Sequence, residues 1–444
     1  MAKVVLIGAN HGGIAFVNTV LGNSQDTEVV VFDKNTNISY LGCGTALWVG
    51  KQIESETCLF YSSEEALSEK GATIHLEAEV KDVDYKTKKV KAIDKDGNEI
   101  IESYDKLVLA TGSTPIKPVI PGMALKNVHY LKLFQDGKTV KSLMDDPSIK
   151  RVAVVGAGYI GVEAAEAVRR CGREAMLFDV ADTCLSGYYD SWFSQDMDKV
   201  LTENGIALHY GEEVKEISGN GKVEQIRTSQ GEYPCDLVIM CIGFRPNNSL
   251  GKGELEISAD GAFVVNLHQE TSMSDVYAIG DCATVFSNAL QRNAYIALAT
   301  NAVRSGVVAG LNIAGTPIQS GGVQGSNGIS IFDYKMVSTG LSVSAAKKAG
   351  FEVLYTDYED LQKPGFMEST NGSVKIRIVY DKGTRRILGA QMASTYDISM
   401  GIHMFSLAIA EQVTIDKLKL LDIFFMPHFN QPYNYITMAA LSAE

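Results

Sequence analysis

The chain has 444 residues, of which 45% are hydrophobic, and a formal net charge of −13 at pH 7. This length suggests two to four domains, and the negative charge argues against a nucleic-acid partner, which would need clustered lysine and arginine. We expect neither a leader peptide nor a membrane-spanning segment, because the sequence shows no such pattern. The seven cysteines are scattered and match no zinc-site or secreted disulfide spacing, so we expect no metal and a cytoplasmic location.

Two units in the sequence combine a buried strand, a glycine turn and a helix. The first is KVVLIGANHGGIAFVNTVL at residues 3–21, followed by a strand at 28–34. The second is KRVAVVGAGYIGVEAAEAVRR at residues 150–170, followed by a strand at 174–180. Short continuous apolar runs are typical of buried parallel strands. Two such units predict two separate dinucleotide-binding domains.

Three further strands, within residues 106–115, 236–246 and 271–285, end in glycine turns and return the chain to the first domain. From about residue 321 the pattern changes, because residues 375–392 predict an antiparallel hairpin and residues 396–411 and 414–422 predict helices. We therefore predict an α/β fold with two Rossmann-like domains and an α+β C-terminal domain. The predicted boundaries are 1–118 and 247–320 for the first domain, 119–246 for the second and 321–444 for the third.

The second glycine signature contains all parts of the dinucleotide fingerprint. Gly156, Gly158 and Gly161 follow a strand and open a helix, and Asp179 ends the next strand. These glycines allow a tight turn, close approach of a pyrophosphate and close packing of helix on strand. A carboxylate at position 179 accepts the adenosine ribose hydroxyls and repels a 2′-phosphate. The pattern predicts a site for NADH rather than NADPH; a plain turn with incidental glycines is the alternative.

The first glycine signature is less regular. Gly8 and Gly12 are present, but Asn10 stands where the second glycine of the fingerprint is expected. Asp33 lies at the expected end of the second strand, and a Gly-Asp turn at Asp281 supports a second dinucleotide site. In a protein that binds two dinucleotides, these features predict the FAD site. The alternative for Asp281 is an ordinary turn residue.

One cysteine, Cys43, lies in the stretch NISYLGCG soon after the first signature. It precedes a predicted helix, and a thiol at a helix N-terminus is expected to have a lowered pKa. His11, in the glycine turn, is a candidate acid–base partner. The alternatives are a small buried cysteine and a histidine that only caps the turn. We predict no resolving cysteine, because the next one, Cys58, is not in a C-x-x-C spacing.

Together, several motifs along the chain resemble a known family. GANHGG, ISYLGCG, ATGSTP, GAGYIGVEAAEA, CIGFRPN, YAIGDCA and ALATNAVRSG occur in this order in the flavin-dependent peroxide and oxygen reductases. These enzymes are a branch of the pyridine nucleotide–disulfide oxidoreductases. The chain is most similar to its water-forming NADH oxidases, then to NADH peroxidase and then to coenzyme A–disulfide reductase.

The resemblance implies tightly bound FAD, NADH as a substrate, and site residues carried over by position. For FAD these are Gly8, Asn10, Gly12, Asp33, Lys34, Cys43, Val80, Ala110, Thr111, Gly112, Ser113, Lys132, Asp281, Leu298, Ala299 and Thr300. For the nicotinamide cofactor they are Gly156, Gly158, Tyr159, Ile160, Gly161, Asp179, Tyr188 and Gly243. Tyr159 is implied to act as a gate over the flavin.

The resemblance also implies a redox cycle at one cysteine. Cys43 is implied to alternate between thiolate and sulfenic acid while O2 is reduced by four electrons to water through a flavin hydroperoxide, and His11 to manage protons. A homodimer or dimer of dimers is implied, in which Phe424, Phe425, His428 and Phe429 reach towards the partner. For the phenylalanines we favour a purely structural interface; the role of His428 stays open.

Three alternatives remain at this stage. An NADH peroxidase uses the same cysteine but starts from hydrogen peroxide. A coenzyme A–disulfide reductase needs a basic coenzyme A site, and the sequence shows no clear one. A protein that senses NADH without fast turnover belongs to a different class. Substantial steady-state consumption of NADH in air would exclude it.

Overall fold

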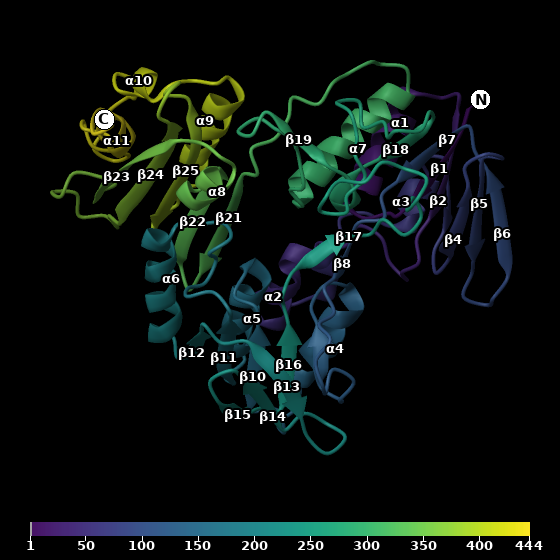
Figure 1. The fold of residues 1–444 in the computed structure, drawn as a ribbon, viewed down its shortest axis with the longest axis horizontal. Coiled ribbons are helices and arrows are strands. Elements are labelled where there is room, and N and C mark those ends of the chain that lie inside the picture. Colours follow the sequence, from purple (N-terminus) through teal and green to yellow (C-terminus); the bar gives the residue numbers. More distant parts are fainter. Residues whose placement is uncertain (1) are drawn as a thin grey trace.

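The computed structural model describes residues 2–444, which form three regions, each built on a five-stranded sheet; two of these sheets are parallel and one is antiparallel (Figure 1). The parallel sheets are those that the two strand–glycine–helix units predict. Among residues 2–444, no helix has the length and apolar character needed to cross a membrane. The arrangement of the sheets confirms the predicted combination of two Rossmann-like domains with an α+β C-terminal domain.

The first domain contains a parallel sheet of order β18-β7-β1-β2-β3. Its strands are β1 (Ala2–Ile7), β2 (Thr27–Phe32), β3 (Ala72–His75), β7 (Lys106–Leu109) and β18 (Val276–Ala278). An antiparallel sheet lies beside it, formed by β4 (Glu79–Asp84), β5 (Lys89–Ile93) and β6 (Glu99–Ser103). The remaining elements are η1 (Gly42–Gly44), α2 (Thr45–Val49), η2 (Glu56–Leu59), α3 (Glu64–Ser68), η3 (Gly280–Cys282), β19 (Val285–Ser287) and β20 (Arg292–Ala294).

Helices α1 (His11–Asn23) and α7 (Ala299–Ile313) cross closely in the first domain. The crossing uses glycine, because a Cβ on Gly306 would overlap the carbonyl oxygen of Gly12 and one on Gly310 would lie 2.8 Å from Cβ of Thr19. The N-termini of the two helices are thereby held in a fixed relation. Both ends belong to segments that the sequence predicted to contact FAD.

The second domain contains a parallel sheet of order β12-β11-β10-β16-β9. Its elements are β9 (Val128–Tyr130), α4 (Phe134–Asp145), β10 (Arg151–Val155), α5 (Tyr159–Arg170), β11 (Glu174–Asp179), α6 (Ser191–Glu203), β12 (Ile206–Tyr210), β13 (Val214–Ser218), β14 (Gln225–Thr228), β15 (Glu232–Pro234) and β16 (Leu237–Met240). The chain enters this domain after β8 (Ser113–Pro115) and leaves it through β17 (Phe244–Pro246). These two strands pair antiparallel, so the segments that enter and leave the second domain lie side by side.

The C-terminal domain has an antiparallel sheet of order β21-β22-β25-β24-β23. Its elements are β21 (Asn327–Ile331), β22 (Tyr334–Gly340), α8 (Val343–Lys348), β23 (Val353–Leu361), β24 (Ser373–Asp381), β25 (Ile387–Ser394), α9 (Ser399–Ala410), α10 (Ile415–Leu418) and α11 (Tyr435–Leu441). Strands β24 and β25 form the predicted hairpin, and α9 and α10 lie where helices were predicted. A buried network fixes this sheet to the second domain, because Asp190, the N-cap of α6, accepts from Nε2 of Gln391 over 2.7 Å and pairs with Arg377 over 3.3 Å.

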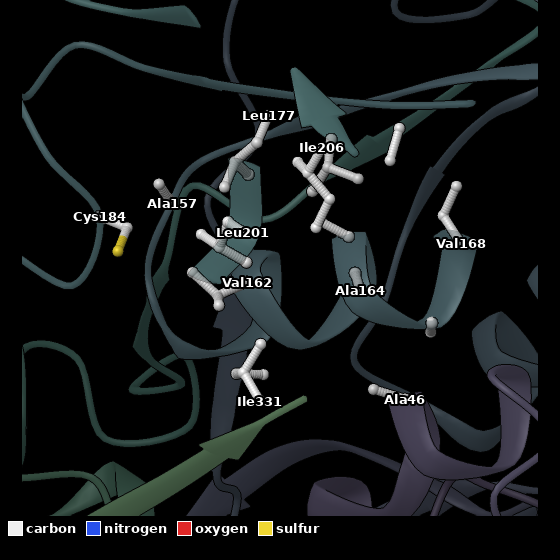
Figure 2. Packing of buried hydrophobic residues seen from close by; sticks show 14 of the residues in the cluster. Ala46, Ala157, Val162, Ala164, Val168, Leu177, Cys184, Leu201, Ile206 and Ile331 are labelled. Carbon is white, nitrogen blue, oxygen red and sulfur yellow. The ribbon is translucent and has the colours of Figure 1, made fainter. Parts of the chain in front are cut away.

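Helix α5 lies at the centre of an apolar core that all three regions share. Figure 2 shows Ile331 of β21 and Ala46 of α2 together below Val162 and Ala164 of α5. In Figure 1 the purple α2 lies beside α5, away from the rest of the first domain. Contacts between the two helices are close, since a Cβ on Gly50 would lie 2.9 Å from Cα of Ala167. This packing brings the Cys43 segment to the second domain.

Candidate functional site

The two glycine turns have the same backbone geometry. Gly8 and Gly156 have φ of +103° and +101°, in the left-handed region that favours glycine. Their N–H groups donate to Phe32 and Phe178, at the ends of the neighbouring strands, over 2.8 and 2.7 Å. A Cβ on Gly8 would overlap the carbonyl oxygen of Ala110, so this turn has no room for a side chain. Both turns lead the strand directly into a helix N-terminus.

The structure identifies a glycine that the sequence analysis omitted. A Cβ on Gly13 would overlap the carbonyl oxygen of Gly8, as one on Gly161 would overlap that of Gly156. Gly13 therefore takes the third position of the fingerprint, where helix and strand pack closely. Gly12 faces α7 instead, and its Cβ would lie 3.3 Å from the carbonyl oxygen of Ala302. Aligning GANHGG with GAGYIG in the sequence gives the same assignment.

The predicted carboxylates at the two strand ends also occupy equivalent positions. Asp33 accepts from the N–H of Ala9 over 2.8 Å, and Asp179 accepts from the N–H of Ala157 over 2.6 Å. Asp33 is buried, and this burial raises its pKa. Each carboxylate is thus oriented at the helix N-terminus of its own domain. This is the arrangement that binds a ribose beside a pyrophosphate.

Three residues predicted to contact FAD meet where the first and second domains are connected. Nζ of Lys132 donates to Oγ of Ser113 over 2.9 Å, and this hydroxyl donates to Oδ2 of Asp281 over 2.9 Å. Nζ of Lys132 lies 3.6 Å from the same carboxylate oxygen. Asp281 stands in η3, which is tied to α7 because Gly280 N–H donates to Oγ of Ser305 over 2.9 Å. This Ser113–Lys132–Asp281 cluster brings together segments far apart in the sequence.

His11 begins α1 and faces a residue that the sequence analysis did not consider. Its Nδ1 is hydrogen-bonded to the hydroxyl of Tyr61 over 2.9 Å, and the two rings are stacked with centroids 5.6 Å apart. Burial lowers the pKa of His11, the charge of Asp281 raises it and that of Lys132 lowers it. Burial therefore favours the neutral form of the imidazole. No hydrogen bond joins it to Cys43 in the part of the chain that the structure describes.

Cys43 lies in η1, immediately before α2, with its side chain exposed. The expectation of a lowered pKa is wrong. Desolvation by the surrounding protein raises the pKa of the thiol, and the charge of Glu163 raises it further, while Lys132 lowers it. Helix α2 has only five residues, so its dipole adds little. The thiol is placed at the surface where the first and second domains meet, and its surroundings favour the protonated form.

Glu163, on α5, is another residue that the sequence analysis missed, and its charge raises the pKa of Cys43. Burial and the neighbouring Glu166 raise the pKa of its carboxyl group to about 7. Its charge also acts on Cys241, whose pKa rises to about 12 through burial and this carboxylate. The sequence signal was an acidic residue four positions after Tyr159, on a helix face expected to be buried.

Tyr159 opens α5 and is anchored by its hydroxyl group. This hydroxyl is hydrogen-bonded to that of Tyr189 over 2.9 Å and also to Oδ1 of Asn327 in β21. Tyr188 packs edge-on against the Tyr159 ring with centroids 4.6 Å apart. The two predicted aromatic residues are therefore neighbours, at a point where the second and C-terminal domains meet.

The turn after β7 is fixed by the strand end that returns from the second domain. The hydroxyl of Thr111 donates to the carbonyl oxygen of Asn247 over 2.6 Å, and Asn247 N–H donates to the carbonyl oxygen of Gly112 over 2.9 Å. Ala110 N–H donates to Ile7 over 2.8 Å. This holds the ATG segment against the end of β1.

The other predicted positions lie around the same two helix N-termini. Leu298 is the N-cap of α7, and Ala299 and Thr300 form its first turn. Val80 lies in β4, beside a bulge, and its neighbours Glu79 and Lys81 line a charged hollow of about 390 Å³ together with Lys34. In the second domain, Gly158 is the N-cap of α5, the position that Asn10 takes at α1 in the first domain. Ile160 lies in the first turn of α5, and Gly243, with φ of +100°, follows β16.

The aromatic C-terminal segment is exposed. The side chains of Phe424, Phe425 and Phe429 are 66%, 48% and 57% exposed, and His428 is exposed as well. Phe424 and Phe429 contact each other edge-on, with centroids 5.9 Å apart. An apolar group of this size at the surface is typical of a protein interface.

The residues around the first glycine turn suit FAD. The first-turn N–H groups of α1 have no carbonyl partners inside the helix and suit a pyrophosphate, and Asp33 suits a ribose. At the other end, the hydroxyl of Tyr295 is buried without a hydrogen-bond partner among residues 2–444, and Asp281 is close enough to influence its pKa. A polar group bound beside the Ser113–Lys132–Asp281 cluster would satisfy it.

Comparisons with known proteins agree with this arrangement. The family described as pyridine nucleotide-disulphide oxidoreductase matches residues 2–306, and its dimerisation domain matches residues 327–434. The NADH oxidase of Streptococcus pyogenes is 55% identical over 456 residues, with 100% of both chains covered. That of Lactococcus lactis is 56% identical over 445 residues, again with 100% of both chains covered. The structure of the water-forming NADH oxidase from Lactobacillus brevis bound to NADH has a TM-score of 0.96 and 36% identity, and the match covers 100% of this chain and 98% of that one.

Lys132 supplies the positive charge that lowers the pKa of Cys43. In Lys132→Met we expect the pH at which Cys43 becomes reactive towards iodoacetamide to move upward, because a thiolate without a nearby cation is less stable. The measurement is the alkylation rate of the Cys43 peptide from pH 5 to 10. Lys138→Met is the control, because Lys138 lies nearby in α4 and its side chain is exposed. An unchanged profile in Lys132→Met would show that the lysine does not act on the thiol.

Proposed function

Because the chain belongs to the pyridine nucleotide-disulphide oxidoreductase family, in the group of NADH oxidases, we propose that it reduces O2 by four electrons to water with electrons from NADH. The observation that carries the proposal is the exposed thiol of Cys43 where the two nucleotide-binding domains meet, whose pKa responds to the charges of Lys132, Asp281 and Glu163. All seven cysteines are free, so no disulfide accompanies this thiol.

The predicted family, the enzyme class and the use of FAD and a pyridine nucleotide are confirmed by this membership. The domain boundaries and the roles of individual site residues stay predictions. FAD, when bound, supplies hydride acceptance and electron transfer to oxygen. The residues of this chain that would hold it are Asp33 at the ribose, the N-terminus of α1 at the pyrophosphate, and the Ser113–Lys132–Asp281 cluster towards the ring.

The second domain would hold NADH. Asp179 would accept the adenosine ribose hydroxyls, and the N-terminus of α5 would face the pyrophosphate. Tyr159 stands at the start of the same helix. Its hydroxyl is anchored by Tyr189 and Asn327, so a movement of the ring to admit nicotinamide would turn about this fixed end. Tyr188 packs on the ring and would follow it.

Cys43 would complete the reduction of peroxide. Its thiolate sulfur attacks one peroxide oxygen, an S–O bond forms, the O–O bond breaks, and the departing hydroxide takes a proton to become water. Two electrons from a second NADH and a proton then convert the sulfenic acid to thiolate and release a second water. Sulfenic acid is a reversible oxidation level, which suits a catalytic cycle. His11, whose neutral form is favoured by burial and which is bonded to Tyr61, would assist proton movement on the α1 side.

We also propose that the protein works as a homodimer, or a dimer of dimers, in the cytoplasm. The match to the dimerisation domain and the exposed side chains of Phe424, Phe425 and Phe429 support a partner on this face. His428 lies among them and would approach the partner chain.

The test of the proposed function is oxygen uptake by the purified holoenzyme with limiting NADH, followed by catalase. We expect about one O2 consumed per two NADH, with no oxygen returned. Oxygen returned by catalase would mean that hydrogen peroxide is the product. Absence of oxygen uptake, with NADH oxidised only after hydrogen peroxide is added, would make the protein a peroxidase.

Cys43→Ser should release hydrogen peroxide in place of water, because a hydroxyl does not cleave the O–O bond as a thiolate does. We expect peroxide to rise from near zero to roughly one per O2 consumed. Peroxide is measured by oxygen return on adding catalase. Cys58→Ser removes the other exposed cysteine and should still form water. Formation of water alone by Cys43→Ser would refute the proposed role of the thiol.

Asp179→Ala should raise the use of NADPH relative to NADH, since the variant lacks the carboxylate that repels the 2′-phosphate. We expect the ratio of the two kcat/KM values to change by roughly tenfold or more, the effect of about 1.4 kcal/mol. Steady-state kinetics with each nucleotide measure it. Glu174→Ala is the matched control, because it removes an exposed carboxylate at the other end of β11. A ratio that stays constant in Asp179→Ala would place the discrimination elsewhere.

A further inference from the structure

A row of polar side chains crosses the C-terminal sheet in register. Each of the five strands contributes one residue, and neighbours along the row are paired across adjacent strands: Asn327, Ser338, Gln391, Arg377 and Asp357. Residues paired in this way point to the same face of a sheet. Ser338, Gln391 and Arg377 are buried, and buried polar groups need hydrogen-bond partners. The element that covers this face must therefore supply polar groups.

One group of partners comes from residues 188–190 of the second domain. Asp190 accepts from Nε2 of Gln391, and its N–H donates to Oε1 of the same amide, each over 2.7 Å. Arg377 pairs with the Asp190 carboxylate over 3.3 Å and is itself paired with Asp357 over 2.6 Å. The row thus fixes the chain directly after the two tyrosines that precede Asp190.

The other end of the row binds the hydroxyl group of Tyr159. Nδ2 of Asn327 donates to the carbonyl oxygen of Gly325 over 2.7 Å, so Oδ1 of Asn327 faces the other way and accepts. It accepts from the hydroxyl of Tyr159, and from Oγ of Ser338 over 3.0 Å. Since a hydroxyl group has one proton, the hydroxyl of Tyr189, 2.9 Å away, donates to the oxygen of Tyr159. The direction of the Asn327 amide therefore determines the hydrogen bonds at the Tyr159 hydroxyl.

These bonds fix the direction of the Tyr159 ring and leave one motion free. The hydroxyl group lies on the long axis of the ring, so an anchored hydroxyl fixes where this axis points, while the ring can turn about the axis without losing a bond. Tyr188, packed edge-on with centroids 4.6 Å apart, sets the plane of the ring. Because the side chain of Tyr188 is 44% exposed, it can move aside when this plane turns.

We propose that Asn327 is a positioning residue for nicotinamide, a role that rests on the proposed binding of NADH by the second domain. By anchoring the hydroxyl group, Asn327 holds the axis of the Tyr159 ring in the direction that the bound nicotinamide requires, before the nucleotide arrives. A ring that is already directed costs less entropy to order on binding, so the anchor strengthens binding of NADH. The C-terminal domain thereby contributes to a site built from the second domain.

Asn327→Leu removes the acceptor at similar side-chain size. In the holoenzyme mixed anaerobically with NADH, we expect the dissociation constant of NADH to rise roughly three- to tenfold, the effect of one hydrogen bond, and the limiting rate of flavin reduction to fall by less than about twofold. Both constants come from the rate of flavin bleaching in stopped flow as a function of NADH concentration. The affinity for ADP-ribose, which lacks nicotinamide, should stay unchanged when it is measured by competition with NADH.

Three results would overturn the proposal. The dissociation constant of NADH can stay unchanged, the change can be confined to the limiting rate, or ADP-ribose can be weakened as much as NADH, which would show damage to the whole second domain. Ser330→Leu is the matched control, because Ser330 is exposed on the opposite face of β21. If Asn327→Leu does not retain flavin, Asn327→Ala carries the same expectation.

Failure of the proposed function would look different. If NADH does not reduce the flavin of the unaltered protein, the NADH site is wrong, and the proposal for Asn327 falls with it. If NADH reduces the unaltered protein and Asn327→Leu has the same two constants, binding of NADH stands and only the anchor is wrong. Because the reaction is anaerobic and contains no peroxide, the identity of the oxidant does not enter the result.

Discussion

The site depends on the packing of α2 against α5. Helix α2 belongs in sequence to the first domain, yet its apolar residues Ala46 and Val49 lie in the core of the second (Figure 2). The same core continues into β21 of the C-terminal domain through Ile331. Because one apolar core joins three parts of the chain, the segment that carries Cys43 is held against the second domain by the burial of α2 rather than by a loop.

Two similar turns give the molecule its two nucleotide sites, and the turns differ at the start of their helices. In each, a carboxylate accepts from the N–H of the residue after the first glycine. The first turn carries Asn10 and His11, and its helix crosses α7 through Gly12 and Gly306. The second carries Gly158 and Tyr159 at its helix start, where Tyr188 packs on the Tyr159 ring.

Much of this arrangement followed from the sequence, because strand, glycine turn, helix and terminal aspartate are neighbours along the chain. The signature at Gly156 and the hairpin around residue 383 are of this local kind. The stacking of Tyr61 on His11 and the effect of the Glu163 charge on Cys43 are not, since they depend on how distant elements pack. The expected pKa of Cys43 was wrong for the same reason: the sequence shows a helix start but not the burial or the charge of Glu163.

The chain enters and leaves the second domain through β8 and β17, which are paired side by side. An inserted unit whose two ends meet leaves its host continuous. The two parts of the first domain therefore close on each other as one sheet, whatever the length of chain between them. Enzymes built on this plan can lengthen or shorten the outer loops of the inserted unit in evolution without moving the residues of the host that flank β8 and β17.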